Sequence, residues 1–283
     1  MGDRVRSIAE AAALIEDGSH LALGGFAITR CVTALVHELI RRRLRHLTLS
    51  QAVAGFDTDL LAGAGCVEAL IYAGGSLDRF GPLHNVNRAI SSGTVALEEC
   101  SSLALTLRYH AAGLGLPFMP SRSLLGSDLL QPLVDAGSAR LERDPFSGRP
   151  TLLLKALRPD WALIHADVAD DAGNAIISGP LWTMREAAFA ARRVILTAER
   201  IVAAGELEPD AVTVPATVVA AVAPAPAGAH PTAVYRHYDY DAPHLRDFVV
   251  HSRKGADGVE QYLERYVLGT GDHAGYLRAV GVA

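Results

Sequence analysis

An apolar run that ends in two glycines is the feature of this chain best suited to chemistry. Residues 21–23 are apolar and are followed by Gly24, Gly25 and Phe26. Because glycine has no Cβ, such a pair at the end of a buried strand lets main-chain amides approach a ligand closely. Each preorganised N–H donor of this kind can stabilise an acyl-transfer transition state by about 3 kcal/mol. The pair predicts an anion or oxyanion site, and a plain tight turn is the alternative interpretation.

Two neighbouring acids form a second candidate group. Glu98 and Glu99 lie at the end of a predicted strand, and a carboxylate can act as a base or as a covalent nucleophile. Adjacent strand residues face opposite ways, so at most one of them can point into a site. The alternative is that one is solvated and the other caps the helix that begins near Ser101.

Two histidines complete the set of candidate groups. His165 lies in an apolar run and is predicted to be a hydrogen-bonded core residue rather than a ligand. His230 lies in a loop just before Pro231, where a structural and a functional role are equally open.

Composition and missing motifs exclude several function classes. The net charge of -5 argues against a nucleic-acid partner, and the basic run at 41–45 is predicted to be a solvated helix end. Cys31, Cys66 and Cys100 are widely spaced, which indicates neither a disulfide framework nor a metal site and favours a reducing cytoplasm. No signal peptide is expected, and no run approaches the roughly 20 apolar residues of a membrane helix, so no membrane partner is expected. The dinucleotide, P-loop and serine-hydrolase motifs are all missing from the sequence.

Strand and helix patterns alternate along most of the chain. Strands are predicted at 21–23, 47–49, 67–73, 94–97, 161–166, 194–197 and 217–222. Helices are predicted at 7–15, 33–44, 57–62, 79–91, 101–114 and 184–191, with a helical C-terminal tail at 258–268 and 273–279. A long irregular excursion is expected at 120–150, and 225–241 reads as irregular with clustered His and Tyr.

This alternation predicts an α/β fold, with an open, mostly parallel, Rossmann-like sheet and helices on both faces. In such sheets ligands bind beyond the carboxyl ends of the strands. Three positions fall at the ends of predicted strands, namely Gly24-Gly25, Ser50-Gln51 and Gly74-Gly75. Their shared position strengthens the hypothesis of a site there.

Several segments, in order along the chain, resemble the α subunits of family I coenzyme A transferases of the glutaconate type. The matching segments are Gly24-Gly25-Phe26 with Arg30, then 110–120, 144–146, 162–166, 228–231 and 238–241. After Phe26 the family signature has a glycine and then a proline near Arg30 and Val32, and this chain has neither. We expect residues 1–283 to form one α-subunit domain.

The resemblance implies an enzyme subunit that moves coenzyme A between an acyl-CoA and a carboxylic acid. It implies that the catalytic glutamate belongs to a homologous β subunit, in a heterodimer or higher hetero-oligomer, so this chain alone is expected to be inactive. Coenzyme A thioester is then a substrate, with no tightly bound cofactor and no metal. This chain would supply backbone donors at Gly24, Gly25 and Phe26, Arg30 as a carboxylate clamp, and polar atoms near Gln51 and Ser76.

Related heterodimers leave the reaction open. The alternatives are the α subunit of an acyl-CoA decarboxylase or of a ring-opening acyl-CoA hydrolase, and a noncatalytic acyl-CoA-binding subunit. The segment 238–241 resembles the glutaconate type more than the others, which favours a transferase.

Overall fold

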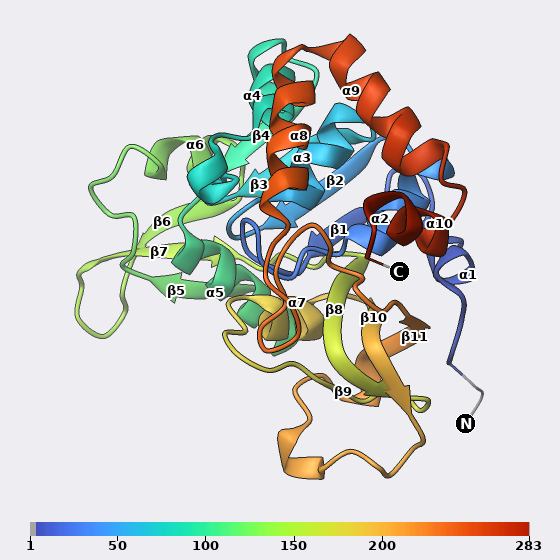
Figure 1. The fold of residues 1–283 in the computed structure, drawn as a ribbon. Helices are drawn as coiled ribbons and strands as arrows, with labels where there is room; N and C mark the ends of the chain where they lie inside the picture. Colours follow the sequence, from blue (N-terminus) through green and yellow to red (C-terminus); the bar gives the residue numbers. More distant parts are fainter. Residues whose placement is uncertain (1–3, 283) are drawn as a thin grey trace.

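A mostly parallel sheet forms the centre of the molecule in the computed structural model, which describes residues 4–282 (Figure 1). The three residues before this range and Ala283, which belong to the expected domain, lie outside the described residues. The strands of the 8-stranded sheet run in the order β11-β10-β8-β1-β2-β3-β4, and β9 pairs antiparallel with β8. Their bounds are β1 (His20–Leu23), β2 (Leu47–Gln51), β3 (Val67–Tyr72), β4 (Ala96–Glu99), β8 (Trp161–Asp170), β9 (Ala175–Ile176), β10 (Arg193–Val202) and β11 (Val219–Pro224).

Helices cover both faces of this sheet, as the alternating pattern predicts. One face carries α1 (Ile8–Ala12), α2 (Thr33–Arg41), α3 (Phe56–Gly63), α4 (His84–Ser91), α8 (Ala242–Arg253), α9 (Ala256–Leu263) and α10 (His273–Val280). The other carries α5 (Ser102–Gly113) and α7 (Met184–Ala190). In β1, Leu21 and Leu23 point into the first core and Ala22 into the second. A strand buried on both faces reads as a continuous apolar run, which is why β1 was predictable at 21–23.

The excursion at 120–150 departs from the alternating pattern but is more regular than predicted. Strands β5 (Phe118–Ser121), β7 (Pro150–Lys155) and β6 (Ala139–Arg143) form a small antiparallel sheet, and α6 (Leu130–Asp135) precedes β6. Leu152 and Leu154 are buried, whereas Leu141 is half exposed. β7 carries a short apolar run at 152–154, whereas β5 and β6 mix apolar with polar or proline residues and are largely exposed.

Three local predictions need correction. The helix expected at 79–91 is broken, because a 3-10 turn at Asp78–Phe80 precedes Pro82 and α4 begins at His84. The helical tail is present, but it begins earlier than predicted, at α8, where the Asp241 side chain caps the first turn. The basic run is not simply solvated, because the Arg41 guanidinium donates to Val267 O (2.9 Å) and so holds the C-terminal segment.

A buried carboxylate links α3 to α4 and makes stability depend on pH. Oδ1 of Asp59 accepts the backbone N–H groups of Asn85 and Val86, each at 2.9 Å, and burial raises the pKa of Asp59 to about 7. This folded-state pKa lies above the ordinary value of 3.8. The stability that protonated Asp59 contributes is therefore fully present below pH 3.8 and is lost as the pH rises to 7.

As the pH rises from 4 to 8, the unmodified chain therefore loses stability that an Asp59→Asn variant keeps. We expect the unfolding free energy of the variant, measured relative to the unmodified chain, to increase by ~1–3 kcal/mol over this range. Urea unfolding of both proteins at the two pH values measures this difference. If the two proteins differ in unfolding free energy by the same amount at pH 4 and at pH 8, Asp59 does not titrate in this range.

Candidate functional site

The end of β1 turns sharply at the glycine pair. The Gly24 N–H donates to Leu163 O (2.8 Å), and Phe26 and Thr29 exchange two backbone hydrogen bonds, both 2.8 Å. The tight turn is therefore present, and the Gly24 and Phe26 amides are used within the chain. Across residues 4–282 no acceptor contacts the Gly25 N–H, although Gly25 is buried. Of the three backbone amides predicted to bind an oxyanion, those of Gly24 and Phe26 are engaged within the chain, and the Gly25 N–H is the remaining candidate.

Backbone crowding explains why position 25 is glycine. Its φ is +84°, a left-handed conformation that a side chain disfavours. A Cβ there would lie 2.6 Å from Arg30 O and 2.7 Å from Thr29 O. The turn can therefore hold its shape only without a side chain at Gly25.

Gln51, at the end of β2, holds the turn from behind. Its Nε2 donates to Gly24 O (2.9 Å), and its Oε1 accepts the hydroxyl of Thr58 (2.6 Å). Both ends of the buried amide are therefore engaged inside the chain, so Gln51 positions the turn. Ser76, partly buried on the loop after β3, accepts the backbone N–H of Asp78 (3.1 Å). Within residues 4–282 its side chain makes no hydrogen bond to the glycine pair.

Arg30 points into the protein rather than into an open site. It is 1% exposed, and its Nη2 donates to Asp167 Oδ1 (3.3 Å) and to Ser178 O (3.0 Å). These bonds are those of a buried, internally paired guanidinium. A role as a carboxylate clamp would require the pair with Asp167 to open, and it stays a prediction.

Asp167 and Glu199 are polar residues of this region that the sequence patterns did not reveal. Nε2 of His237 also lies 2.9 Å from Asp167 Oδ1, so three segments meet at one carboxylate. Glu199 Oε1 contacts Nε2 of His165 (2.7 Å) and accepts the hydroxyl of Tyr238 (2.7 Å). The one sequence feature that pointed to these contacts was the clustering of His and Tyr at 225–241.

His165 is a hydrogen-bonded core residue, as predicted. Its Nδ1 contacts the hydroxyl of Thr197 (2.9 Å), and burial lowers its pKa. Burial acts to raise the pKa of Glu199, but the hydrogen bonds from His165, Tyr238 and the Ala227 N–H outweigh it and lower that pKa. Glu199 is therefore an ionised, fully engaged acceptor.

His230 is also a hydrogen-bonded residue of the core. Its two ring nitrogens contact the hydroxyl of Tyr276 (2.7 Å) and Oδ2 of Asp241 (3.1 Å). Both contacts bind the C-terminal helices to the loop that carries this residue.

A groove of about 590 Å³ lies beside the β1 turn. Its walls include Thr29, Trp182, His237 and Tyr238, and Phe26 stacks on Trp182 with ring centroids 4.8 Å apart. His237 and Tyr238 connect the groove to Asp167 and Glu199. An apolar wall therefore adjoins a buried charged network at the carboxyl ends of the strands.

The two candidate acids on β4 lie in a different environment. Glu98 pairs with the buried Arg108 and accepts the hydroxyl of Ser138 (2.5 Å). Glu99 is exposed. Helix α5 is capped by the Ser101 side chain, so neither glutamate caps it. A catalytic role for either one remains a prediction.

Metal and membrane features are missing from the residues the structure describes. Within 4–282 no group of three or more His, Cys, Asp and Glu side chains is placed to hold a metal ion. In the same range no helix combines the length and apolar character that crossing a bilayer needs. The three cysteines are free and buried.

Comparisons with known sequences agree with this architecture. The model of the coenzyme A transferase family matches residues 5–225. A glutaconate CoA-transferase chain from Acidaminococcus fermentans is 32% identical over 94% of this chain and 88% of its own length. The IpdA chain of a cholesterol ring-cleaving hydrolase from Mycobacterium tuberculosis is 31% identical over 99% of this chain and 98% of its own. An uncharacterised Archaeoglobus fulgidus protein is 36% identical over 99% of this chain, which spans only 63% of that relative.

Solved structures show the same fold. The crystal structure of the A. fermentans glutaconate enzyme matches with a TM-score of 0.92 at 30% identity, covering 98% of this chain and 93% of the other. The crystal structure of a variant of the decarboxylase AibA/AibB matches with a TM-score of 0.83 at 34% identity, covering 93% and 100%.

Proposed function

The chain belongs to the coenzyme A transferase family, and from that premise we propose that it is the α subunit of a heteromeric enzyme that moves coenzyme A between an acyl-CoA and a carboxylic acid. The observation that carries the proposal is the buried Gly25 N–H, which has no acceptor within residues 4–282 and lies at the carboxyl end of β1. A buried donor without a partner is costly, and a ligand oxygen would satisfy it.

The reaction divides into balanced steps. A glutamate of the partner chain attacks the acyl-CoA carbonyl, the thiolate leaves, and an acyl-glutamyl anhydride forms. The thiolate then attacks the glutamyl carbonyl and releases the first carboxylic acid, leaving a glutamyl-CoA thioester. A second acid reverses these steps. The Gly25 N–H donates to the oxyanion that develops in the attack.

The acids of this chain near the turn support an external nucleophile. Asp167 accepts from Arg30 and the Ser178 N–H and lies in ion-pairing contact with His237. Glu199 accepts from Tyr238 and the Ala227 N–H and contacts His165. Because these carboxylates are fully engaged, neither is free to attack a thioester. We therefore propose that a β-type partner completes the site and that the chain alone does not turn over.

A second function rests on the likeness to AibA/AibB and to the IpdA chain of the hydrolase. The same α architecture would then serve ring-opening hydrolysis or decarboxylation of an acyl-CoA, with the partner deciding the reaction. A noncatalytic acyl-CoA-binding subunit is the remaining alternative. A single domain over residues 1–283 and a cytoplasmic location belong to the same proposal.

Co-expression with a β-type chain tests the proposal. The purified complex is incubated with acetyl-CoA or glutaryl-CoA and a second carboxylic acid, and the new thioester, free CoA and CO₂ are measured together. Exchange of CoA between the acids supports the transferase. Release of free CoA or CO₂ without exchange would assign the hydrolase or decarboxylase instead, and no turnover with any thioester would leave only the binding subunit.

A further inference from the structure

A buried chain of hydrogen bonds lies behind the glycine pair and begins at Thr58 on α3. The Thr58 hydroxyl donates to Gln51 Oε1 (2.6 Å), and Gln51 Nε2 donates to Gly24 O (2.9 Å). Thr58 is 0% exposed and Gln51 is 1% exposed. Gly24 O and the Gly25 N–H belong to the same planar peptide unit. The chain of bonds therefore ends at the peptide whose N–H the proposed reaction uses.

These hydrogen bonds all run in one direction, from hydroxyl to side-chain amide to peptide. An amide that accepts a hydrogen bond at its oxygen becomes a stronger donor at its nitrogen, because oxygen, carbon and nitrogen share delocalised electrons. In such a chain each bond strengthens the next by roughly 10–30%. The Thr58 hydroxyl therefore acts through Gln51 to increase the donor strength of the Gly25 N–H.

Asp57 fixes which end of the Gln51 amide faces Gly24. Asp57 Oδ1 also accepts from Gln51 Nε2 (3.4 Å) and accepts the backbone N–H of Thr58 (2.9 Å). Burial raises the pKa of Asp57 to about 6, so above that pH the carboxylate is ionised and can only accept hydrogen bonds. A reversed Gln51 amide would place its oxygen against two acceptors, Asp57 Oδ1 and Gly24 O. The direction of the hydrogen bonds is therefore set by the residues around Gln51.

We propose that Thr58 and Gln51 are positioning residues for the proposed reaction. Together they hold the peptide that carries the Gly25 N–H in one orientation and strengthen that group as a donor to the developing oxyanion. The inference rests on the proposed function, since it concerns the same amide. Both side chains are buried and act through Gly24, so neither contacts the substrate. Their effect is larger on the transition state than on the bound substrate, because an oxyanion accepts a stronger hydrogen bond than a neutral carbonyl oxygen does.

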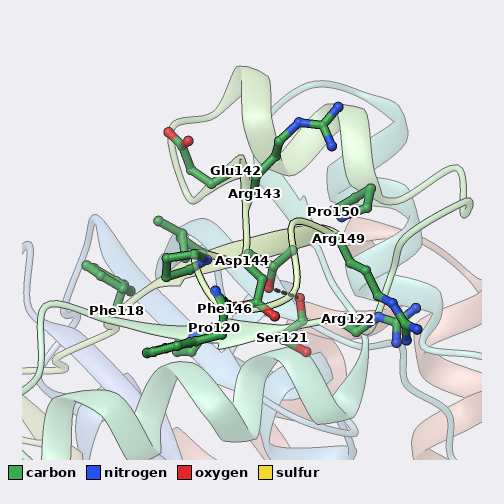
Figure 2. A pocket seen from close by; sticks show the side chains of 13 residues that line it. Phe118, Pro120, Ser121, Arg122, Glu142, Arg143, Asp144, Phe146, Arg149 and Pro150 are labelled. Carbon is green, nitrogen blue, oxygen red and sulfur yellow. Dashed lines mark hydrogen bonds between the residues drawn. The ribbon is translucent and has the colours of Figure 1, made fainter.

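Two substitutions of Thr58 separate its hydroxyl from its packing. Thr58→Val keeps the shape of the side chain and removes the hydroxyl, whereas Thr58→Ser keeps the hydroxyl. The matched control is Thr151→Val, which removes a buried hydroxyl that donates to Ser121 O (3.2 Å). Thr151 and Ser121 line a pocket on the small antiparallel sheet (Figure 2), which is separate from the sheet that carries the turn. Thermal unfolding confirms that each variant is folded.

Nuclear magnetic resonance of the full chain measures the effect on the peptide itself. The sequence holds two Gly-Gly pairs, at 24–25 and 74–75. Labelling with glycine that carries ¹³C at the carbonyl and ¹⁵N at the amide therefore gives two correlations between a labelled carbonyl and the amide that follows it. One reports on the Gly25 N–H, and the other, from Gly75, is an internal reference.

In Thr58→Val we expect the Gly25 amide proton and the Gly24 carbonyl carbon to shift to higher field, because both lose polarisation when the hydroxyl is removed. The Gly75 correlation should stay in place. Thr58→Ser and the Thr151→Val control should leave both correlations where they are in the unmodified chain.

Turnover by the assembled complex gives the second measurement. We expect Thr58→Val to lower kcat about 3- to 10-fold, as for the loss of one hydrogen bond, and to leave the KM for acyl-CoA unchanged. Thr58→Ser and Thr151→Val should keep the kcat of the unmodified complex. In a Gln51→Met background, Thr58→Val should cause no further loss, because the link to Gly24 is already cut.

Three outcomes would overturn the inference and leave the proposed function intact. The first is an unchanged Gly25 correlation in Thr58→Val, and the second is equal kcat for Thr58→Val and Thr151→Val. The third is a loss of kcat in Thr58→Ser as large as in Thr58→Val, which would assign the effect to packing. If the unmodified complex transfers no coenzyme A, the proposed function is contradicted instead, while the resonances still report whether Thr58 acts on the Gly25 amide.

Discussion

Replacing Asp167 by alanine is expected to lower the free energy of unfolding by ~3–5 kcal/mol, because it leaves the Arg30 guanidinium charged, buried and without its carboxylate. The remaining acceptors of Arg30 are the carbonyl oxygens of Ser178 (3.0 Å) and His165 (3.4 Å). Neutral oxygens do not balance a buried positive charge. Chemical unfolding monitored by circular dichroism measures the loss.

Two further variants separate this ion pair from general destabilisation. Glu142→Ala breaks an exposed pair with Arg140 and should cost no more than ~1 kcal/mol. Adding Arg30→Met to the Asp167 variant should restore part of the loss, since it removes the unpaired charge. An Asp167→Ala protein as stable as Glu142→Ala would show that the pair does not hold the β1 turn to β8.

Gly25→Ala is expected to lower kcat of the assembled enzyme by ~10²-fold or more. The added Cβ would meet Arg30 O at 2.6 Å, so the turn must move and carry the Gly25 N–H with it. The measurement is steady-state turnover of acyl-CoA by complexes of matched composition.

Gly18→Ala is the matched control. Gly18 also has a positive φ, +76°, but nothing lies within 4 Å of a Cβ built there, and it precedes β1 rather than following it. This variant should lose ~1 kcal/mol of stability from backbone strain and keep its activity. Equal turnover by the two alanine variants would show that the Gly25 amide takes no part in catalysis.

The parts of the fold that could be predicted are those buried on both faces. In β1 the residues 21–23 are all apolar, β8 begins with the apolar run 161–164, and β2 alternates Leu47 and Leu49 with polar residues. Glycines or polar residues after these runs marked the carboxyl ends of the strands. The β5–β7–β6 sheet was missed because it is covered on one side only and half exposes residues such as Leu141. Local sequence patterns indicate which residues are buried, and the strands of this small sheet are only partly buried.

The site was predictable only in its local part. A glycine pair after a strand is visible in sequence, and so is its need for close backbone approach. The partners that occupy the Gly24 and Phe26 amides were not, because Leu163 O comes from a distant strand and Thr29 O from the shape of the turn itself. Asp167 lies in an apolar run, and its contact with Arg30 spans 137 positions along the chain.

Intact-mass measurement of both chains after the complex meets an acyl-CoA tests most directly whether the partner supplies the nucleophile. We expect the partner chain to gain the mass of coenzyme A less one water, as a thioester on a glutamate, while this chain keeps its own mass, and we expect this chain alone to gain nothing. A coenzyme A adduct on Glu98, Glu99 or Glu199 of this chain, or turnover by this chain alone, would contradict it.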